Sequence, residues 1–152
     1  MPAPRIALVV LHIIFAALWF GAPLLSKRAL KLAEPQGRGA FLAAAQLGER
    51  GGMLVGIGTI GALATGLGLV FYVYGGFGNL TVNFHIALTL LILAMINGFG
   101  FLKPLAEKIR VAAEDQAWTP EKTAPLLKKM SAGGGINHLL WLAILILMYW
   151  RF

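Results

Sequence analysis

Three histidines are the side chains of this sequence best suited to chemistry. They are His12, His85 and His138, and they fall within residues 6–26, 51–102 and 130–150, three stretches that contain no Asp, Glu, Lys or Arg. An ionisable side chain inside a membrane segment is costly and usually marks a functional site. The simpler alternative is a polar side chain that faces water or a neighbouring backbone carbonyl. Facing neutral imidazoles in a helical bundle are the usual ligands of a b-type haem.

The elements that would position these histidines are four membrane-spanning helices. Hydrophobic residues make up 59% of the chain and charged residues 12%, whereas soluble domains carry about a quarter charged residues. A helix needs roughly 20 apolar residues to cross a bilayer, so the longest charge-free stretch holds two crossings, broken at Gly75-Gly76-Phe77-Gly78-Asn79. We therefore predict an all-α, single-domain membrane four-helix bundle over residues 1–152, with spans at residues 6–25, 52–74, 80–102 and 135–150.

The first and third loops carry most of the basic residues, which predicts the orientation of the bundle. The positive-inside rule places both loops in the cytoplasm and both termini outside a bacterial inner membrane. One Arg precedes the first span and several basic residues follow it, so we do not expect a cleaved signal peptide. We expect short interfacial helices in both loops, after the break at residues 35–37 and over residues 104–116. The basic side chains are Lys27, Arg28, Lys31, Arg38 and Arg50 in the first loop, and Lys103, Lys108, Arg110, Lys122, Lys128 and Lys129 in the third.

Two of the histidines lie at the same depth in this topology. His12 lies about 10 Å and His85 about 8 Å below the outer boundary, at about 1.5 Å per residue. Spans one and three are diagonal in a ring-ordered bundle, so both side chains can point at the bundle axis. We therefore predict His12 and His85 as the axial ligands of haem b, and expect His12→Ala to lose haem. His138 lies about 8 Å above the opposite boundary, where it would ligate a second haem, touch a propionate or serve a proton path.

Small residues follow helical spacing on the second span. Gly58, Ala62 and Gly66 form one stripe, and Gly52 and Gly56 form another. Such stripes allow close helix packing, within one protomer or between the two copies of a homodimer. The other interpretation is that they leave room for a flat macrocycle.

Aromatic residues near the histidines would form the walls of such a site. Trp19 and Phe15 lie near His12 on the first span, and Trp141 lies near His138 on the fourth. Aromatic side chains in membrane helices more often pack against neighbours or lie at the interface.

Composition excludes several other kinds of chemistry. The absence of cysteine excludes disulfides, iron–sulfur clusters, thiolate metal sites and c-type haem attachment. All the acidic residues lie in the loops, so no intramembrane carboxylate supports a proton-coupled carrier. The positive charge is explained by topology, and no nucleic-acid partner is expected.

Short motifs recur across most of the chain. They are Leu11-His12-Ile13-Ile14-Phe15, Leu18-Trp19-Phe20-Gly21, Ala64-Thr65-Gly66-Leu67-Gly68-Leu69, Phe84-His85-Ile86 with Asn97-Gly98, and Ile136-Asn137 followed by the apolar run to Arg151-Phe152. These motifs resemble the HemJ-type protoporphyrinogen oxidases and the wider CopD-like four-helix membrane proteins. The resemblance implies a haem b-binding, usually oligomeric bundle that oxidises protoporphyrinogen. It adds Asn137 to the cofactor-binding residues His12, His85, His138, Trp19 and Trp141.

The chain departs from that family where the family carries proton-moving groups. Ala87 stands where the family has Lys, Asn97 where it has a second His, and His138 where it has Glu. The residues that would hold haem remain, whereas those that would serve the oxidase reaction are missing.

We therefore predict a membrane b-type cytochrome, expected to be a homodimer, that transfers electrons or binds a small ligand. One alternative is a HemJ-like oxidase that passes electrons to a quinone, which complementation of an oxidase-deficient strain would reveal. The other is a cofactor-free assembly subunit, which would co-purify with a larger complex without haem.

Overall fold

The structure, a computed structural model, describes residues 3–149, and the elements in that range are all helical. Four continuous helices of 30 to 37 residues are long and apolar enough to cross a membrane. The chain is thus a multi-pass membrane protein with an all-α four-helix fold, as predicted. Its elements are α1 (Ala3–Ala33), α2 (Arg38–Tyr74), α3 (Val82–Met95), α4 (Lys103–Glu114) and α5 (Pro120–Tyr149), with the short segments η1 (Glu34–Gln36), η2 (Phe77–Asn79) and η3 (Ile96–Leu102).

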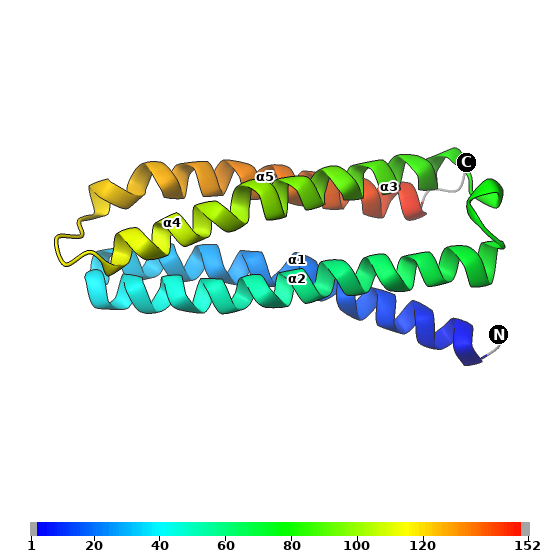
Figure 1. The fold of residues 1–152 in the computed structure, drawn as a ribbon, viewed down its shortest axis with the longest axis horizontal. Helices are drawn as coiled ribbons and strands as arrows, with labels where there is room; N and C mark the ends of the chain where they lie inside the picture. The colour runs from blue at the N-terminus through cyan, green and yellow to red at the C-terminus, as the bar shows by residue number, and fades with distance from the viewer. Residues whose placement is uncertain (1–2, 150–152) are drawn as a thin grey trace.

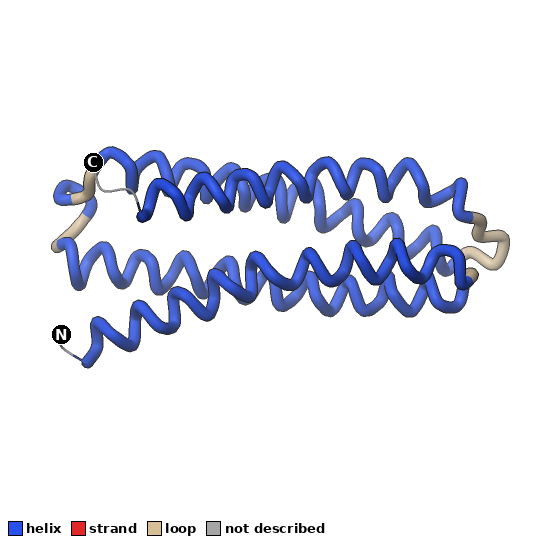
Figure 2. The backbone as a smooth tube through the Cα atoms, turned by 180° about the vertical axis from the view of Figure 1, so that it is seen from behind, coloured by secondary structure: helices blue, strands red, loops and turns tan. Residues whose placement is uncertain are grey.

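The helices form two antiparallel pairs (Figure 1). One pair is α1 with α2, and the other is α5 with the single long helix Val82–Glu114 that α3, η3 and α4 make together. Figures 1 and 2 show α1 crossing α2 on its way to the N-terminus, so that α2 separates the first turns of α1 from α3. Contact between the pairs is richest where α4 packs on α2.

The outer faces of the helices are apolar and exposed. Ile13, Ile57 and Leu139 are each more than half exposed, on α1, α2 and α5. A water-soluble bundle would turn polar faces outward. Exposed aliphatic side chains around every helix are instead those of a protein whose solvent is lipid.

The turn between the second and third spans lies where the sequence predicts it. Helix α2 ends at Tyr74, and Gly75 and Gly76 take positive φ angles of 73° and 118°. Glycine adopts this left-handed backbone without the steric penalty of a Cβ atom, which ends the helix. The last predicted residue of the fourth span, Trp150, lies outside the described residues.

The two basic loops differ from the prediction. Their helical segments exist but are not separate interfacial helices: α1 continues to Ala33, α2 begins at Arg38, and α5 begins at Pro120. At about 1.5 Å per residue, α2 is about 55 Å long, longer than the roughly 30 Å hydrocarbon core. The spanning helices therefore project beyond the membrane at what we call the basic end, the end of the bundle that contains η1 and the α4–α5 connection (residues 115–119).

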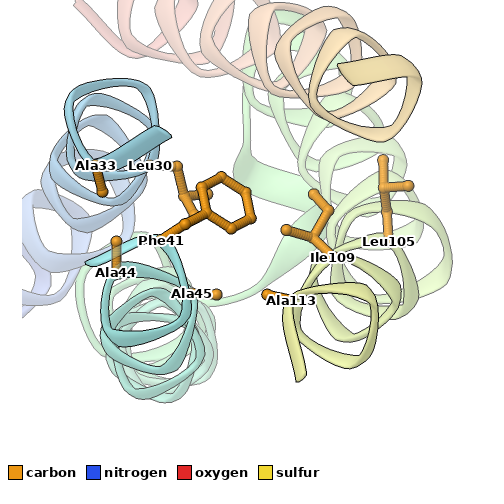
Figure 3. Packing of buried hydrophobic residues seen from close by; sticks show 8 residues of the cluster. All are labelled: Leu30, Ala33, Phe41, Ala44, Ala45, Leu105, Ile109 and Ala113. Atoms are coloured by element: carbon orange, nitrogen blue, oxygen red, sulfur yellow. The ribbon is translucent and has the colours of Figure 1, made fainter. Parts of the chain in front are cut away.

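An apolar cluster explains why the helices continue there. Its centre is Phe41 on α2 and Ile109 on α4, both almost fully buried, and Figure 3 shows the two side chains filling the space between their helices. The apolar face of α4, predicted to lie on the membrane surface, packs instead against the other helices. The remaining members of this basic-end cluster are Leu30, Ala33, Ala44, Ala45, Leu105 and Ala113.

Polar contacts close the basic end. Arg38 at the start of α2 donates hydrogen bonds to the carbonyl oxygens of Ala113 (3.2 Å) and Glu114 (2.6 Å), which satisfies the last carbonyls of α4. Lys122 forms an ion pair with Asp115 at 2.9 Å across the α4–α5 connection. The hydrogen bonds from Lys122 and from the backbone N–H of Ala117 hold the pKa of Asp115 below its ordinary value.

Candidate functional site

A cavity lies between the two helical pairs, in the half of the bundle toward the basic end. Its volume is about 760 Å³, within the range of small-molecule and cofactor sites. The basic-end cluster closes one side. On the other side a second cluster, Trp19 with Ala87, Ala94 and Ile144, joins α1 to α3 and α5, and Trp19 and Ala94 belong both to it and to the cavity wall.

All four long helices contribute to the cavity wall. Charged side chains gather toward the basic end of the wall, and aromatic and small residues form the part nearer the middle of the bundle. The lining residues are Trp19, Phe20, Pro23, Ser26 and Lys27 of α1; Gln46, Gly48, Glu49, Arg50, Gly52, Met53, Val55, Gly56 and Thr59 of α2; Ala94, Met95, Gly98, Phe99, Leu102, Lys103, Ala106 and Glu107 of the α3–η3–α4 helix; and Met130, Gly134, Asn137, His138 and Trp141 of α5.

His138 is the histidine in this wall. Its Nδ1 lies 2.6 Å from the carbonyl oxygen of Gly134, one helical turn earlier, so Nδ1 carries the proton and donates it. The second ring nitrogen, Nε2, is buried and has no hydrogen-bond partner among residues 3–149. A buried polar atom without a partner is uncommon in a folded protein. A neutral imidazole whose Nδ1–H is bound to a carbonyl presents a lone pair on Nε2, the state in which histidine ligates a metal.

Aromatic rings hold the His138 imidazole in place. The Phe20 ring meets it edge-on with centroids 5.1 Å apart, and Phe20 also stacks on Trp141 at 4.1 Å. Trp19, the next residue of α1, is buried at the inner limit of the cavity. Trp19 and Trp141 both line the cavity, and their role as walls for a flat ligand stays a prediction.

The π-helical segment η3 adjusts the third helix to the cavity. Seven residues, Ile96–Leu102, follow this wider helical form, which is frequently found at functional sites. Asn97 donates hydrogen bonds to the carbonyl oxygen of Gly133 (2.9 Å) and to Oδ1 of Asn137 (3.1 Å). These hydrogen bonds hold η3 against α5 at Gly133 and Asn137, which precede His138 on that helix. Asn137 thus lines the cavity, and its side-chain Oδ1 already accepts a hydrogen bond from Asn97.

The two glycine stripes of α2 have different roles. A Cβ atom on Gly58 would collide with the backbone nitrogen of Trp19 at 2.6 Å, and one on Gly66 would lie 3.2 Å from the His12 ring. This stripe packs α2 against α1 within the protomer. A Cβ on Gly56 would meet only Phe99, at 4.0 Å, and one on Gly52 would meet nothing within 4 Å. Gly52 and Gly56 therefore leave space in the cavity, so each stripe fits one of the two interpretations.

His12 lies outside the cavity wall and faces α2. Its Nδ1 lies 3.1 Å from Oγ1 of Thr65, and the Thr65 hydroxyl donates to the carbonyl oxygen of Gly61 at 2.6 Å. His12 therefore donates to Thr65, and its ring is packed against Gly66. Phe15, the aromatic neighbour of His12, packs against Gly61 of α2 rather than against the cavity.

His85 is exposed on α3, outside the cavity wall. It and His12 both precede the second cluster along their helices, whereas the cavity follows that cluster. The structure gives His12 and His85 separate surroundings, and their pairing around haem stays a prediction. Among residues 3–149, three or more His, Asp or Glu side chains do not gather into a metal-binding group, but an axial haem site needs only one or two imidazoles.

Sequence reasoning missed several residues of the cavity. Phe20 contacts His138, and Phe99 lies near Gly56 across the cavity. Lys27 also lines the cavity, although the sequence indicates only its role in setting the orientation in the membrane. The signal for Phe20 was its place beside Trp19, but helical spacing alone does not tell which of two neighbours faces α5. Comparison of the chain with protein-family models, with curated proteins and with solved structures found no match. The resemblance to HemJ-type proteins therefore stays a prediction from the sequence motifs.

Proposed function

We propose that this membrane protein binds haem b in the cavity between its two helical pairs, with His138 as the axial ligand. The observation that carries the proposal is the buried Nε2 of His138, which has no partner within residues 3–149 and belongs to a ring fixed by the Gly134 carbonyl. Histidine ligands of metals usually donate their other ring N–H to such an acceptor. This proposal replaces His12 and His85, the axial ligands predicted from the sequence, with His138.

The remaining walls suit the same ligand. Phe20, Trp141 and Trp19 supply aromatic faces, and Gly52 and Gly56 leave room for a broad planar molecule. The cavity volume is in the range of cofactor sites. The Phe20 ring packs against the imidazole and also stacks on Trp141, and in such apolar surroundings polar interactions are stronger than in water.

The chemistry follows from a single imidazole in the wall. Haem supplies a one-electron iron centre when it is bound. His138 is the histidine that lines the cavity among the described residues, so the chain offers one protein ligand there. This favours binding of a small ligand over the bis-histidine arrangement of a pure electron carrier. By the positive-inside rule, the basic end faces the cytoplasm of a bacterial inner membrane.

The test is the absorption spectrum of purified protein produced with ample haem. Wild type, His12→Ala and His85→Ala should all show a Soret band and a b-type pyridine haemochrome. His138→Ala should lose the band, and added imidazole should restore part of it by replacing the missing ring. The other two histidine variants are the matched controls.

Two results would overturn the assignment. A colourless wild-type protein would remove the haem hypothesis. Full haem content in His138→Ala, together with loss of haem in His12→Ala or His85→Ala, would restore the first pair of ligands predicted from the sequence.

A further inference from the structure

The cavity has an excess of positive charge toward the basic end. Lys27, Arg50 and Lys103 line it there, with Glu49 and Glu107 as the acidic residues. Glu49 already accepts an ion pair from Arg110, with Nε and Oε2 3.2 Å apart. The three cations form no ion pair within residues 3–149, so the lining has more positive than negative charge available to a ligand.

Lys27 is the cation that reaches deepest into the wall. Its ammonium lies so close to Gly134 that a Cβ atom on that buried glycine would collide with it. The Lys27 side chain is half-buried, whereas Arg50 and Lys103 are exposed. A cation withdrawn from water without a counter-ion is costly. An anion in the cavity would remove that cost.

Gly134 connects this cation to the imidazole. The carbonyl oxygen of Gly134 accepts the hydrogen bond from Nδ1 of His138, and the Lys27 ammonium packs against the side of Gly134 where a Cβ atom would lie. The wall therefore runs from Trp19 and Trp141, through His138, to Lys27 at the basic end. A molecule that matches this order has an apolar aromatic body and acidic groups at one edge.

We propose that the cavity binds its ligand through carboxylate groups at the basic end, held by Lys27 with Lys103 and Arg50, so that a tetrapyrrole dicarboxylate lies with its acidic edge toward that end. The inference rests on the proposed function and adds the ligand's chemical class and orientation. Charge-assisted hydrogen bonds to carboxylates are among the stronger polar contacts.

The experiment compares ferric haem b with its dimethyl ester, which keeps the macrocycle and lacks the carboxylates. The full-length protein, purified without haem and placed in phosphatidylcholine nanodiscs, is titrated with each compound by absorbance. Wild type should bind haem more tightly than the ester. Lys27→Met should weaken haem by about tenfold or more, the effect of losing one hydrogen bond to a charged group, and leave the ester unchanged.

Lys31→Met is the matched control, because Lys31 is exposed one turn along the same helix and lies outside the cavity wall. Lys103→Met, at an exposed position, tests the proposal again should Lys27→Met fail to fold. Equal affinity of wild type for haem and ester, equal loss of both in the Lys27 and Lys103 variants, or the same effect in Lys31→Met would overturn the carboxylate proposal and leave haem binding standing. Failure of wild type to bind either compound would overturn both.

Discussion

At the scale of single residues, the three histidines are distinguished by what their ring nitrogens contact. His138 has a fixed Nδ1 and a buried Nε2 without a partner in the described chain, His12 is bound to Thr65 of the neighbouring helix, and His85 is exposed. All three look alike in the sequence, because each is a lone imidazole in an apolar run. The side-chain contacts assign His12 to the packing of α1 on α2 and leave Nε2 of His138 without a hydrogen-bond partner among residues 3–149.

Removing the partner of His12 tests that division. Thr65→Val deletes the hydroxyl that accepts from His12, and we expect the unfolding free energy to fall by about 0.6–1.5 kcal/mol, as for other interhelical hydrogen bonds in membranes. Reversible unfolding in SDS–detergent mixtures measures the change. The haem content should stay at the wild-type level.

Thr89→Val is the control for this substitution, because the Thr89 hydroxyl bonds only the carbonyl oxygen of His85 on its own helix, at 3.0 Å. It should leave stability nearly unchanged. A large loss of haem in Thr65→Val would instead indicate that His12 is a ligand.

At the scale of elements, helix α2 separates packing from ligand space by the face on which each glycine lies. Gly58 permits the close approach of the α1 backbone, whereas Gly56 faces the cavity. The π-helical segment η3 forms the wall across the cavity from α2. Hydrogen bonds from Asn97 to α5 fix the position of η3 against α5. Elements rather than single residues therefore determine the width of the cavity.

Filling this space from α2 should block the ligand without disrupting the helices. In Gly56→Leu the new side chain meets only Phe99 at the position of its Cβ, 4.0 Å away, and projects into the cavity. We expect overpacking against the ligand to cost about 1–3 kcal/mol of binding, or roughly 5- to 150-fold in affinity. Haem titration measures it, and circular dichroism verifies the helical content.

Gly135→Leu provides the matched control, since a Cβ on this exposed α5 glycine meets nothing within 4 Å and the residue lies outside the cavity wall. Wild-type affinity in Gly56→Leu would show that the ligand binds elsewhere.

At the scale of the whole molecule, an apolar cluster lies on each side of the cavity along the bundle. The basic-end cluster joins α1 and α2 to α4, and the cluster around Trp19 joins α1 to α3 and α5. The cavity therefore lies between the two clusters, and all four long helices contribute to its wall.

The orientation can be measured because the chain has no cysteine. Single cysteines in place of Ala117, in the α4–α5 connection, and Gly78, in η2, lie at exposed positions at opposite ends of the bundle. A membrane-impermeant maleimide applied outside spheroplasts should label Gly78→Cys and leave Ala117→Cys unlabelled. Inverted vesicles should give the reverse pattern, and labelling of Ala117→Cys from outside would reverse the proposed topology.

The sequence by itself determined the number of spans, the turn at Gly75 and the helical character of the loops. Charge-free length and turn chemistry are local properties, and the bilayer leaves the chain few alternatives to a helix. Local pattern also predicted Trp19 and Trp141 near a histidine. The local pattern wrongly predicted loop helices separate from the spans. The packing of Phe41 against Ile109, which stabilises the continuous helices, joins segments far apart in the chain and cannot be seen in a local pattern.

The tertiary structure decided which histidine faces the cavity. A depth along a helix follows from counting residues, so His12 and His85 could be placed at one level. The direction of each side chain depends on how helices cross, and α1 crosses α2 so that His12 turns toward Thr65. Contacts between the first and last helices place Phe20 against His138 and Lys27 against Gly134, and no local sequence pattern specifies these contacts.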